Sequence, residues 1–366
     1  MRGQLESQPP LFTAVTPSSR VPQDHPARSI KQLADDVLRE LAPVLDRLYA
    51  THGRPSIPPE CLLKAQLLIA LYSVRSERQF CERLDYDLLF RFFLDLDLDT
   101  ASWDATSFTK NRDRLMRHDV ARLFFEGVLR RAQQLGLLSR EHFTVDGTLL
   151  EAWASQKSFR PRGERPGDRP PPDDPGNPTV NFRGEKRSNA THQSTTDPES
   201  RLAKKGAGKE AKLSYSAHVL MENRHGLCVD FCVAAADGFA EREAGVALLS
   251  ALPSRGFTPR TLGGDKGYDK GDFPGRVLAL GVTPHFAINA SGAKDSAARR
   301  FVNEPGYAVS QRKRKRVEEI FGWMKTIGGL RRTRFKGRAK TEWLGWWVAA
   351  AYNLLRISRL VTPLPA

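Results

Sequence analysis

The stretch Phe143-Thr-Val-Asp-Gly-Thr-Leu-Leu150 marks the point where the hydrophobic pattern of this chain changes. Before it, apolar residues recur at three- and four-residue steps, which is typical of amphipathic helices. Within it, β-branched and apolar residues alternate around a single acidic residue that is followed by glycine, which is typical of a strand. The sequence therefore predicts a helical first part and a second part built on a sheet.

The part before this strand is predicted to be an all-helical domain over residues 28–138. Leu33, Val37, Leu41 and Leu48 mark the apolar face of its first helix, and similar patterns continue to about Gly136. The first 27 residues are polar and rich in proline between positions 8 and 26, so we expect a disordered tail over 1–27.

The part after the strand alternates between strand and helix patterns. Residues 160–212 are rich in Pro, Arg, Lys, Gly and Asp and offer little to bury, so they are predicted to be a flexible insertion after the first strand. Strands are then expected over 215–221 and 227–233, followed by a helix, a strand ending at Gly264, and a strand over 282–288. This order predicts a mixed α/β or α+β layer with a central sheet over residues 139–366.

The charge of the chain bears on its partners. It has 57 Lys and Arg residues against 42 Asp and Glu, a net charge of +15 at pH 7. This excess favours a polyanion, either nucleic acid or an anionic membrane surface, as a partner, although a solvated basic surface explains the charge alone equally well. Because the sequence has neither an apolar run of about 18 residues nor a secretory leader, we expect no membrane partner and a cytoplasmic, nucleoid-associated protein. Its four cysteines are sparse, which favours buried thiols over a zinc site.

Three acidic residues stand out by their positions. Asp146 and Asp265 each end a predicted strand beside a glycine, a position where acidic residues also serve as ordinary turn formers. Glu318 lies on a predicted helix over 311–326, at the border of its apolar face, whereas Glu319 points to solvent. Two strand-end aspartates and a glutamate on a covering helix suit two Mg²⁺ ions about 3.5–4 Å apart, as phosphodiester chemistry requires.

Basic residues surround the third carboxylate. At 100° per residue, Arg314 and Lys325 lie in the same stripe of the helix as Glu318. They could bind phosphates near the scissile bond, but an intrahelical ion pair between Arg314 and Glu318 would explain the spacing equally well. The residues expected to contact DNA phosphates are Arg312, Lys313, Arg314, Lys315, Arg316 and Lys325.

The order and spacing of these motifs resemble the bacterial insertion-sequence transposases of the DDE type over nearly the whole chain. The segments that carry the resemblance are Gly53-Arg-Pro-Ser-Ile-Pro-Pro59, Val145-Asp-Gly-Thr148, Gly264-Asp-Lys-Gly-Tyr268 and Arg314-Lys-Arg-Val-Glu-Glu-Ile-Phe-Gly-Trp-Met-Lys325. The last is similar to the family signature of Tyr, two residues, Arg, three residues, Glu, six residues and Lys. Gln311 stands where the signature has tyrosine, and Tyr307 is out of register.

The resemblance implies a ribonuclease H-like catalytic domain in which Asp146, Asp265 and Glu318 bind two Mg²⁺ ions, with Mn²⁺ as a substitute. It implies that water frees a 3′-OH at each end of the element and that this hydroxyl then attacks target DNA. The implied partners are double-stranded DNA, as terminal inverted repeats and target, and a second copy of the chain, because synapsis joins two ends. The helical domain would bind DNA or mediate dimerisation.

Two other functions fit the same residues. A transposase relic could bind DNA as a self-repressor without catalysis, and a nuclease on the same fold could cut DNA without joining it. The role of the insertion is also open, since its basic residues could follow the DNA backbone or form only a tolerated loop.

Overall fold

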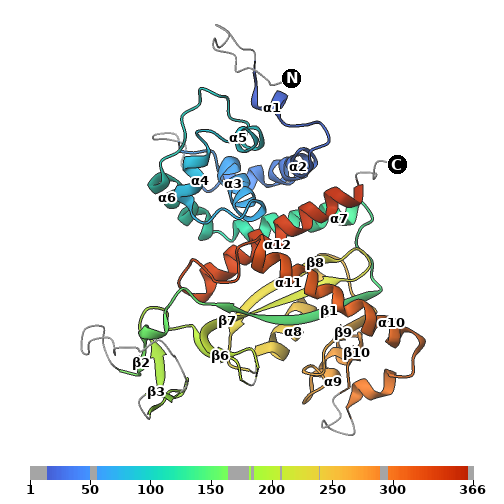
Figure 1. The fold of residues 1–366 in the computed structure, drawn as a ribbon. Coiled ribbons are helices and arrows are strands. Elements are labelled where there is room, and N and C mark those ends of the chain that lie inside the picture. The colour runs from blue at the N-terminus through green and yellow to red at the C-terminus, as the bar shows by residue number, and fades with distance from the viewer. Residues whose placement is uncertain are drawn as a thin grey trace, which may run out of the picture.

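The computed structural model of this chain describes residues 15–49, 56–163, 181–182, 185–206, 208–238, 240–288 and 296–361. A bundle of helices from the first part of the chain stands above a sheet formed by the rest, and the C-terminal helix α12 (Arg338–Val361) lies between them (Figure 1). The predicted fold class is confirmed, because N-terminal helices precede a mixed α+β layer. Among these residues, no helix is both long enough and apolar enough to span a membrane.

The helical bundle is formed by short helices with defined starts. Ser76, Asp87 and Asp104 each cap a helix by accepting a hydrogen bond from a backbone N–H of its first turn. The helices are α1 (Pro17–Arg20), α2 (Pro26–Asp46), α3 (Pro59–Leu71), α4 (Glu77–Arg83), α5 (Leu88–Leu94), α6 (Ala105–Met116) and α7 (Val120–Gln134).

The N-terminal prediction needs a correction for residues 15–27. They form α1 and the start of α2, where the composition predicts a disordered tail. Thr16 and Ser19 form a capping box, Val21 is buried, and Arg28 donates to the backbone carbonyls of Ser18 and Val21. These contacts order a segment whose prolines and polar residues give no helical period. Residues 1–14 lie outside the described part.

The main sheet is mixed. Its central strand β1 (His142–Glu151) pairs antiparallel with β7 (Ala211–Glu222) and parallel with β9 (Thr261–Gly264), which pairs parallel with β10 (Thr283–Phe286). On its other edge, β7 pairs with β8 (Leu227–Ala235) and β6 (Arg201–Lys204). The order β8, β7, β1, β9, β10 places β1, which contains Asp146, next to β9, which ends just before Asp265.

Part of the 160–212 insertion forms strands that its composition does not predict. β2 (Phe159–Pro161) pairs with β5 (His192–Ser194), β3 (Asn181–Phe182) pairs with β4 (Glu185–Lys186), and β6 extends the main sheet. A buried carboxylate, Asp197, accepts a hydrogen bond from Tyr215 Oη at 2.6 Å and so ties the insertion to β7. Polar anchors of this kind leave no hydrophobic pattern in the sequence. Residues 164–180 lie outside the described part.

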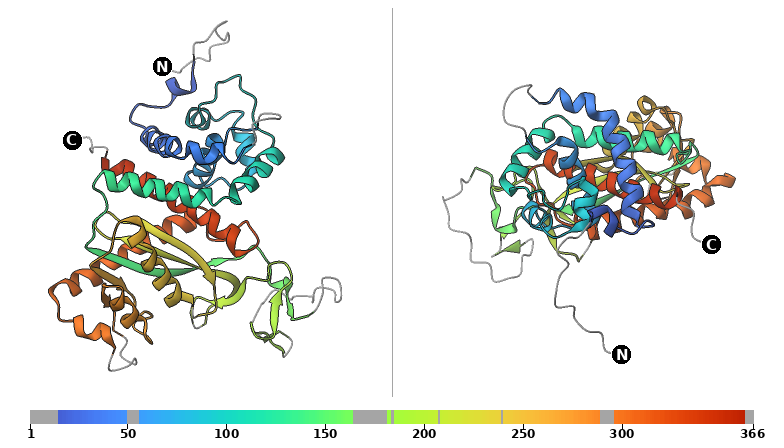
Figure 2. Two further views of the ribbon diagram at one scale, coloured as in Figure 1. Left: turned by 180° about the vertical axis from the view of Figure 1, so that it is seen from behind. Right: turned by 90° about the horizontal axis from the view of Figure 1, so that it is seen from above.

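Helices cover both faces of the sheet. From behind, α8 (Ala240–Ala251) and α9 (Phe273–Ala279) lie on the face opposite α12 (Figure 2). On the α12 side, the helix predicted over 311–326 is interrupted. It consists of α10 (Pro305–Lys313), a 3₁₀ turn (Arg314–Arg316) and α11 (Val317–Thr326). The interruption falls on five consecutive basic residues, where neighbouring like charges disfavour a regular helix.

α12 joins the two parts of the molecule through aromatic contacts. Trp347 lies 5.1 Å from Phe124 of α7 between ring centroids, and Trp346 lies 4.9 Å from Phe125 of α7 and 5.7 Å from Phe231 of β8. We call these five residues the α12 seam. The seam makes the Trp-rich part of α12 a packing face. The division expected at residue 138 stays a prediction, because α12 packs against both parts.

Candidate functional site

The fold brings Asp146 and Asp265 together in the interior of the sheet, where β9 ends beside β1. β1 and β9 run parallel, and the last paired residues are Thr144 and Gly263. Extending this register by two residues places Asp265, just after the end of β9, beside Asp146 in the middle of β1. Two aspartates that are 119 positions apart in the sequence are therefore neighbours in space.

Local backbone contacts fix both carboxylates. Asp146 Oδ1 accepts a hydrogen bond from the N–H of Gly147 at 2.8 Å, and Asp265 Oδ1 accepts one from the N–H of Gly267 at 2.7 Å. The glycine before Asp265 is required by packing, since a Cβ on Gly264 would lie 2.9 Å from the Phe286 ring. The motif around Asp265 thus holds its strand close to β10 and turns its carboxylate in a defined direction.

A third carboxylate, Glu241, lies near these two. A Cβ placed on Gly147 would lie 3.3 Å from Glu241 Oε1, and one placed on Gly267 would lie 2.9 Å from Asp265 Oδ1 and 3.5 Å from Glu241 Oε2. Burial and the negative charges of Asp265 and Glu241 raise the pKa of Asp146 to about 7. We call Asp146, Asp265 and Glu241 the carboxylate cluster.

Sequence reasoning assigned no role to Glu241. It is in the first turn of α8, where an acidic residue is ordinary because it complements the helix dipole. Glu243 stands in the same turn but is exposed and forms an ion pair with Arg276 at 2.5 Å. No pattern in the sequence separates these two glutamates, since only the tertiary fold brings one of them to the end of β9.

Glu318 approaches the same region from the other face of the sheet. Lys325 of α11 donates a hydrogen bond to Thr148 Oγ1 of β1 at 2.6 Å, and a Cβ on Gly263 of β9 would lie 3.4 Å from Arg314 Cβ. The helical segment therefore runs along β1 from the level of Thr144 to that of Thr148. Glu318 lies between these two anchors, two turns before Lys325 on the same side of α11, at about the level of Asp146. Its side chain is exposed.

The structure separates the roles of the predicted basic residues. Arg314 is half-buried and donates to Gln311 Oε1 at 2.9 Å, and no ion pair links it to Glu318 among the described residues. Burial and the charges of Lys205 and Arg331 lower the pKa of Lys325. The intrahelical pairing of Arg314 with Glu318 is thus not what the fold shows, and Lys325 sits where several cations meet.

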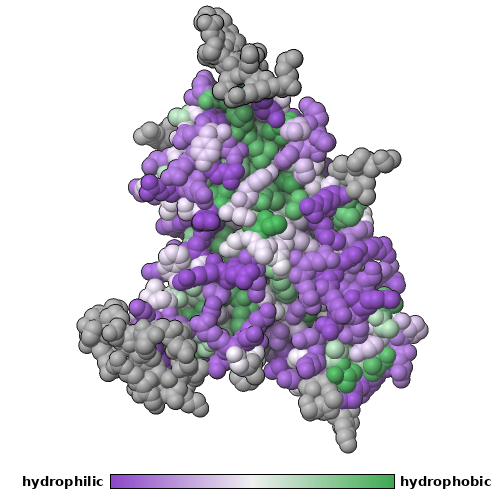
Figure 3. Space-filling model, viewed as in Figure 1, coloured by the Kyte–Doolittle hydropathy of each residue, from purple (hydrophilic) through white to green (hydrophobic). Residues whose placement is uncertain are grey.

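The other four basic residues that were expected to contact DNA differ in exposure. Arg312, Lys313 and Lys315 are exposed, on the side of the molecule where α10 lies and where Figure 3 shows a largely hydrophilic surface. Arg316 instead donates to the backbone carbonyls of Asn223 and Arg224, at 2.8 and 2.7 Å, and so anchors the turn between β7 and β8.

The position of the missing signature tyrosine is also defined. Gln311 Nε2 donates to the carbonyl of His285 at 2.6 Å, and Tyr307 Oη, one turn earlier, donates to the carbonyl of Phe286 at 2.8 Å. Both side chains hold α10 against the end of β10. Gln311 therefore has a structural contact in place of the tyrosine of the signature.

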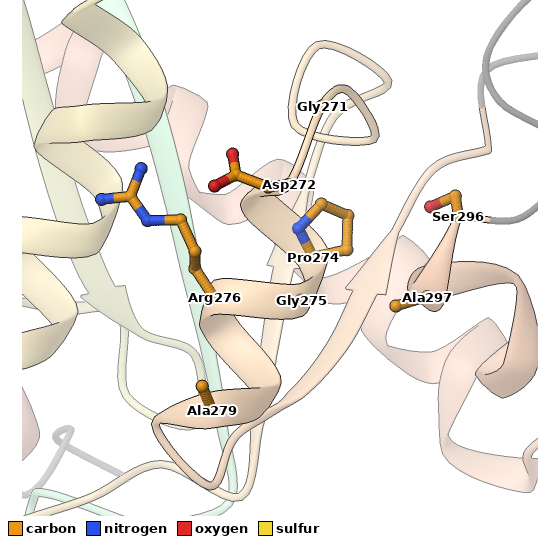
Figure 4. A pocket seen from close by; sticks show the side chains of 8 residues that line it. All are labelled: Gly271, Asp272, Pro274, Gly275, Arg276, Ala279, Ser296 and Ala297. Atoms are coloured by element: carbon orange, nitrogen blue, oxygen red, sulfur yellow. The ribbon is translucent and has the colours of Figure 1, made fainter.

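A cavity of about 350 Å³ opens beside the carboxylate cluster. Gly147, Thr148 and Glu241 line it, together with Lys204 and Lys205 at the end of β6. A second cavity, of about 430 Å³, lies at α9 (Figure 4). Its charged lining residues are Asp272 and Arg276, and the others are glycine, proline, alanine and serine. Arg276 points away from Ser296 toward α8, where it pairs with Glu243. The first cavity is the one that adjoins the predicted site.

The donor chemistry of the cluster fits a divalent cation. Carboxylate oxygens are the ligands that Mg²⁺ and Mn²⁺ take, and a cation would favour the charged form of Asp146, whose pKa is raised by burial first and then by the neighbouring carboxylates. Among the described residues, no three His, Cys, Asp or Glu side chains stand in a ready-made metal-binding group. Asp146 and Asp265 are thus juxtaposed, while Glu318 is brought to the same level without contact.

Solved transposase structures are similar to this chain at low scores. A cryo-EM structure of a piggyBac transposase synaptic complex with hairpin DNA is similar, with a TM-score of 0.42 and 10% identity, over 92% of this chain and 75% of that chain. A crystal structure of a pre-cleavage Mos1 transpososome gives a TM-score of 0.20 and 11% identity, over 85% of this chain and 80% of that chain. The Mos1 mariner paired-end complex with Mn gives 0.20 and 11%, over 92% and 96%. These scores are too low to carry the assignment.

Two family models match the sequence directly. Residues 15–114 match a transposase domain (DUF772), and residues 175–354 match the transposase DDE domain. The second range contains Asp265, Glu318 and Lys325, whereas Asp146 lies before it and rests on its pairing beside Asp265. The two ranges together span most of the chain, and the chain belongs to the DDE transposases of insertion-sequence type.

Proposed function

We propose that this transposase cuts phosphodiester bonds at the ends of an insertion sequence and joins the freed 3′-OH ends to target DNA, in a reaction that depends on Mg²⁺. The juxtaposition of Asp146, in the middle of β1, and Asp265, just after the end of the parallel strand β9, carries this proposal. Glu318, at the same level on α11, would complete the set that holds two divalent ions, with Mn²⁺ able to replace Mg²⁺. When bound, such ions activate the attacking oxygen and stabilise the leaving one.

The chain's own residues would position the DNA. Asp146 and Asp265 are held by the N–H groups of Gly147 and Gly267, so their carboxylates keep a fixed direction as substrate enters. Lys325, fixed over β1 by Thr148, presents a cation within reach of a phosphate at this point of the sheet. Arg314 lies close enough to lower the pKa of Asp146 and stands on the same side. These cations would neutralise the phosphates on either side of the scissile bond.

A strand-transfer assay tests the proposal. Purified protein, DNA carrying the element ends and a supercoiled target are incubated with Mg²⁺ or EDTA. We expect joined products only with the metal, and a loss of roughly a thousandfold in Asp146→Asn, Asp265→Asn and Glu318→Gln. Glu319→Gln is the matched control, because this neighbour is exposed and pairs with Arg356 instead. Activity in Glu318→Gln with none in Glu319→Gln would show that the wrong glutamate has been assigned.

The same assay separates the other two functions. DNA binding without cleavage in either Mg²⁺ or Mn²⁺ would indicate a relic that acts as a self-repressor. Cleavage without joined products would indicate a nuclease. We propose that double-stranded DNA is the partner in each case and that two copies of the chain are needed to hold two element ends.

The exposed basic residues should contribute to affinity for any DNA sequence. Neutralising Arg312, Lys313 and Lys315 should weaken binding to all sequences and reduce the slope of log affinity against log salt by up to about 3, or about 1 per phosphate contact. Arg316→Gln is predicted to destabilise the β7–β8 turn instead, since its guanidinium contacts protein carbonyls. An unchanged slope in the triple variant would remove these residues from the DNA interface.

A further inference from the structure

The end of β6 brings two lysines to the cavity of about 350 Å³. Lys204 is the last residue of β6 and Lys205 follows it, and both line this cavity. Gly147 and Thr148 of β1, which come directly after Asp146, line it as well. Because β6 pairs with β7 and β7 pairs with β1, the sheet itself fixes this part of the insertion to the strand that carries Asp146.

Two more cations lie in the same region. Lys325 Nζ donates to Thr148 Oγ1 at 2.6 Å, and Thr148 lines the cavity. Arg331 follows α11, and its carbonyl accepts a hydrogen bond at 3.0 Å from the N–H of Glu151 at the end of β1. Burial lowers the pKa of Lys325, and the positive charges of Lys205 and Arg331 lower it further. The insertion, α11 and the loop after α11 thus each contribute a basic residue to one region.

These cations are not balanced by carboxylates in the described part of the chain. There, Lys204, Lys205 and Arg331 take part in no ion pair. The carboxylate of Glu151 is already paired with Lys212 Nζ at 3.0 Å. An excess of positive charge beside a cavity attracts an anion, and phosphate oxygens form strong, charge-assisted hydrogen bonds with ammonium and guanidinium groups.

The acidic part of the cavity lining lies at the carboxylate cluster. Glu241 is the one acidic residue among the described lining residues. Its oxygens Oε1 and Oε2 lie 3.3 and 3.5 Å from the positions of a Cβ on Gly147 and on Gly267, in the turn that holds Asp265. The lining is therefore acidic beside Asp265 and basic at the end of β6. A DNA strand with one phosphate at the cluster would have other phosphates along its backbone to meet the lysines.

We propose that Lys204 and Lys205 bind a backbone phosphate of the DNA strand that enters the site, so that the end of β6 forms a phosphate subsite together with Lys325 and Arg331. The inference rests on the proposed function, since it takes DNA as the substrate held at the carboxylate cluster. It gives the insertion a direct part in holding the substrate, a role that its composition leaves open.

The salt dependence of DNA binding tests this subsite. The full-length protein carries Lys204→Gln and Lys205→Gln together, and the matched control is Lys209→Gln, an exposed charge in the same β6–β7 turn but outside the cavity lining. Fluorescence anisotropy measures affinity for a duplex with one element end at several salt concentrations. We expect the double variant to bind about tenfold more weakly, with the slope of log affinity against log salt reduced by about 1–2. Lys209→Gln should keep the wild-type slope.

Neutral methylphosphonate linkages locate the contact. They replace the phosphates of the duplex one at a time around the cleavage site. We expect one position near this site at which the neutral linkage weakens binding by the wild type and by Lys209→Gln, but not by the double variant, because a phosphate and its lysines act as a pair. A folding defect in the double variant would not produce a loss confined to one linkage.

The outcomes separate this inference from the proposed function. Wild-type affinity and slope in the double variant, or the same pattern of losses along the DNA in both proteins, would overturn the role of Lys204 and Lys205 alone. A contact that maps far from the cleavage site would overturn it too. Strand transfer that survives in Asp146→Asn and Asp265→Asn would instead overturn the proposed function, and absence of DNA binding by the wild type would overturn both.

Discussion

The α12 seam and the carboxylate cluster lie on the same sheet but bury different chemistry. In the seam, rings from α7, β8 and α12 are tilted or edge-on to one another at 4.9–5.7 Å between centroids. In the cluster, Asp146 and Asp265 lie side by side, and Glu241 lies near Gly147 beside His218, whose ring nitrogens have no hydrogen-bond partner among the described residues. Burial of apolar area stabilises a fold, whereas buried like charges and unsatisfied polar groups destabilise it.

This difference teaches which region serves which purpose. A region that lowers stability persists only where it has another use, and the cluster contains Asp146 and Asp265, for which we propose metal binding. The seam holds the helical bundle to the sheet. The apolar burial in the seam offsets the destabilising effect of the cluster. Substitutions in the two regions should therefore have opposite effects on stability and activity.

Removal of a seam ring should have the largest effect on stability. Trp347 is fully buried, and Trp347→Ala should lower the free energy of unfolding by about 3–5 kcal/mol, because it removes apolar contacts and leaves a cavity. Urea denaturation measures this change. Trp153→Ala is the control, since this ring is 48% exposed and should matter little. Equal losses in the two variants would show that the seam is not the main source of stability.

Overpacking the seam should have the next largest effect. A Cβ on Gly345 of α12 would meet the Phe231 ring well inside van der Waals contact. Gly345→Ala should therefore destabilise the protein by about 1–3 kcal/mol, although alanine favours a helix. Gly322→Ala on α11, where a Cβ meets nothing within 4 Å, should be neutral or stabilising. A stabilised Gly345→Ala variant in thermal unfolding would mean that β8 and α12 are less tightly packed than the structure shows.

Acid should weaken the sheet through a half-buried histidine, His142, at the start of β1. Burial lowers the pKa of His142 to about 4, below its usual 6.5, so the folded state favours the neutral ring. This stability is present above about pH 6.5 and is lost as the pH falls toward 4, by about 2 kcal/mol between pH 7 and pH 5. The urea concentration at the midpoint of unfolding should therefore change less with pH in His142→Gln than in the wild type. His118 is exposed, so His118→Gln is the control and should show the same dependence on pH as the wild type. An equally steep dependence in His142→Gln would mean that other groups cause the loss of stability in acid.

The sequence predicts the seam better than the cluster, for a physical reason. Helical periodicity and tryptophan spacing show which face of α12 is buried, and alternation around Asp146 shows the central strand. Asp146, Asp265 and Glu318 were found through motifs, and the first two are neighbours in the structure. The chemical role of the three stays a prediction.

What the sequence could not provide depends on tertiary contacts. Glu241 and Glu243 occupy the same helical turn, and only the packing of α8 against β1 and the Gly267 turn tells them apart. The order in residues 15–27 comes from contacts made by Arg28 with preceding carbonyls. The interruption of the helix at Arg314 accompanies contacts of Arg316 with the β7–β8 turn. Each of these involves polar atoms, which leave no periodic trace in a sequence.

The smallest predicted effect distinguishes the two regions most directly. Asp146→Asn removes a charge that is buried and repelled by Asp265 and Glu241, so the metal-free protein at about pH 8 should gain roughly 1 kcal/mol of stability while losing activity. The same substitution at Asp36, which pairs with Arg131 at 3.0 Å in the helical bundle, should instead cost a few tenths of a kcal/mol or about 1 at most. Urea unfolding in EDTA compares the two variants.

Added Mn²⁺ should raise the stability of the wild type and not that of Asp146→Asn, because an ion that binds only the folded state stabilises it. A loss of stability in Asp146→Asn as large as that in Asp36→Asn would mean that the carboxylate is held by favourable partners, and the contrast between cluster and seam would then fail.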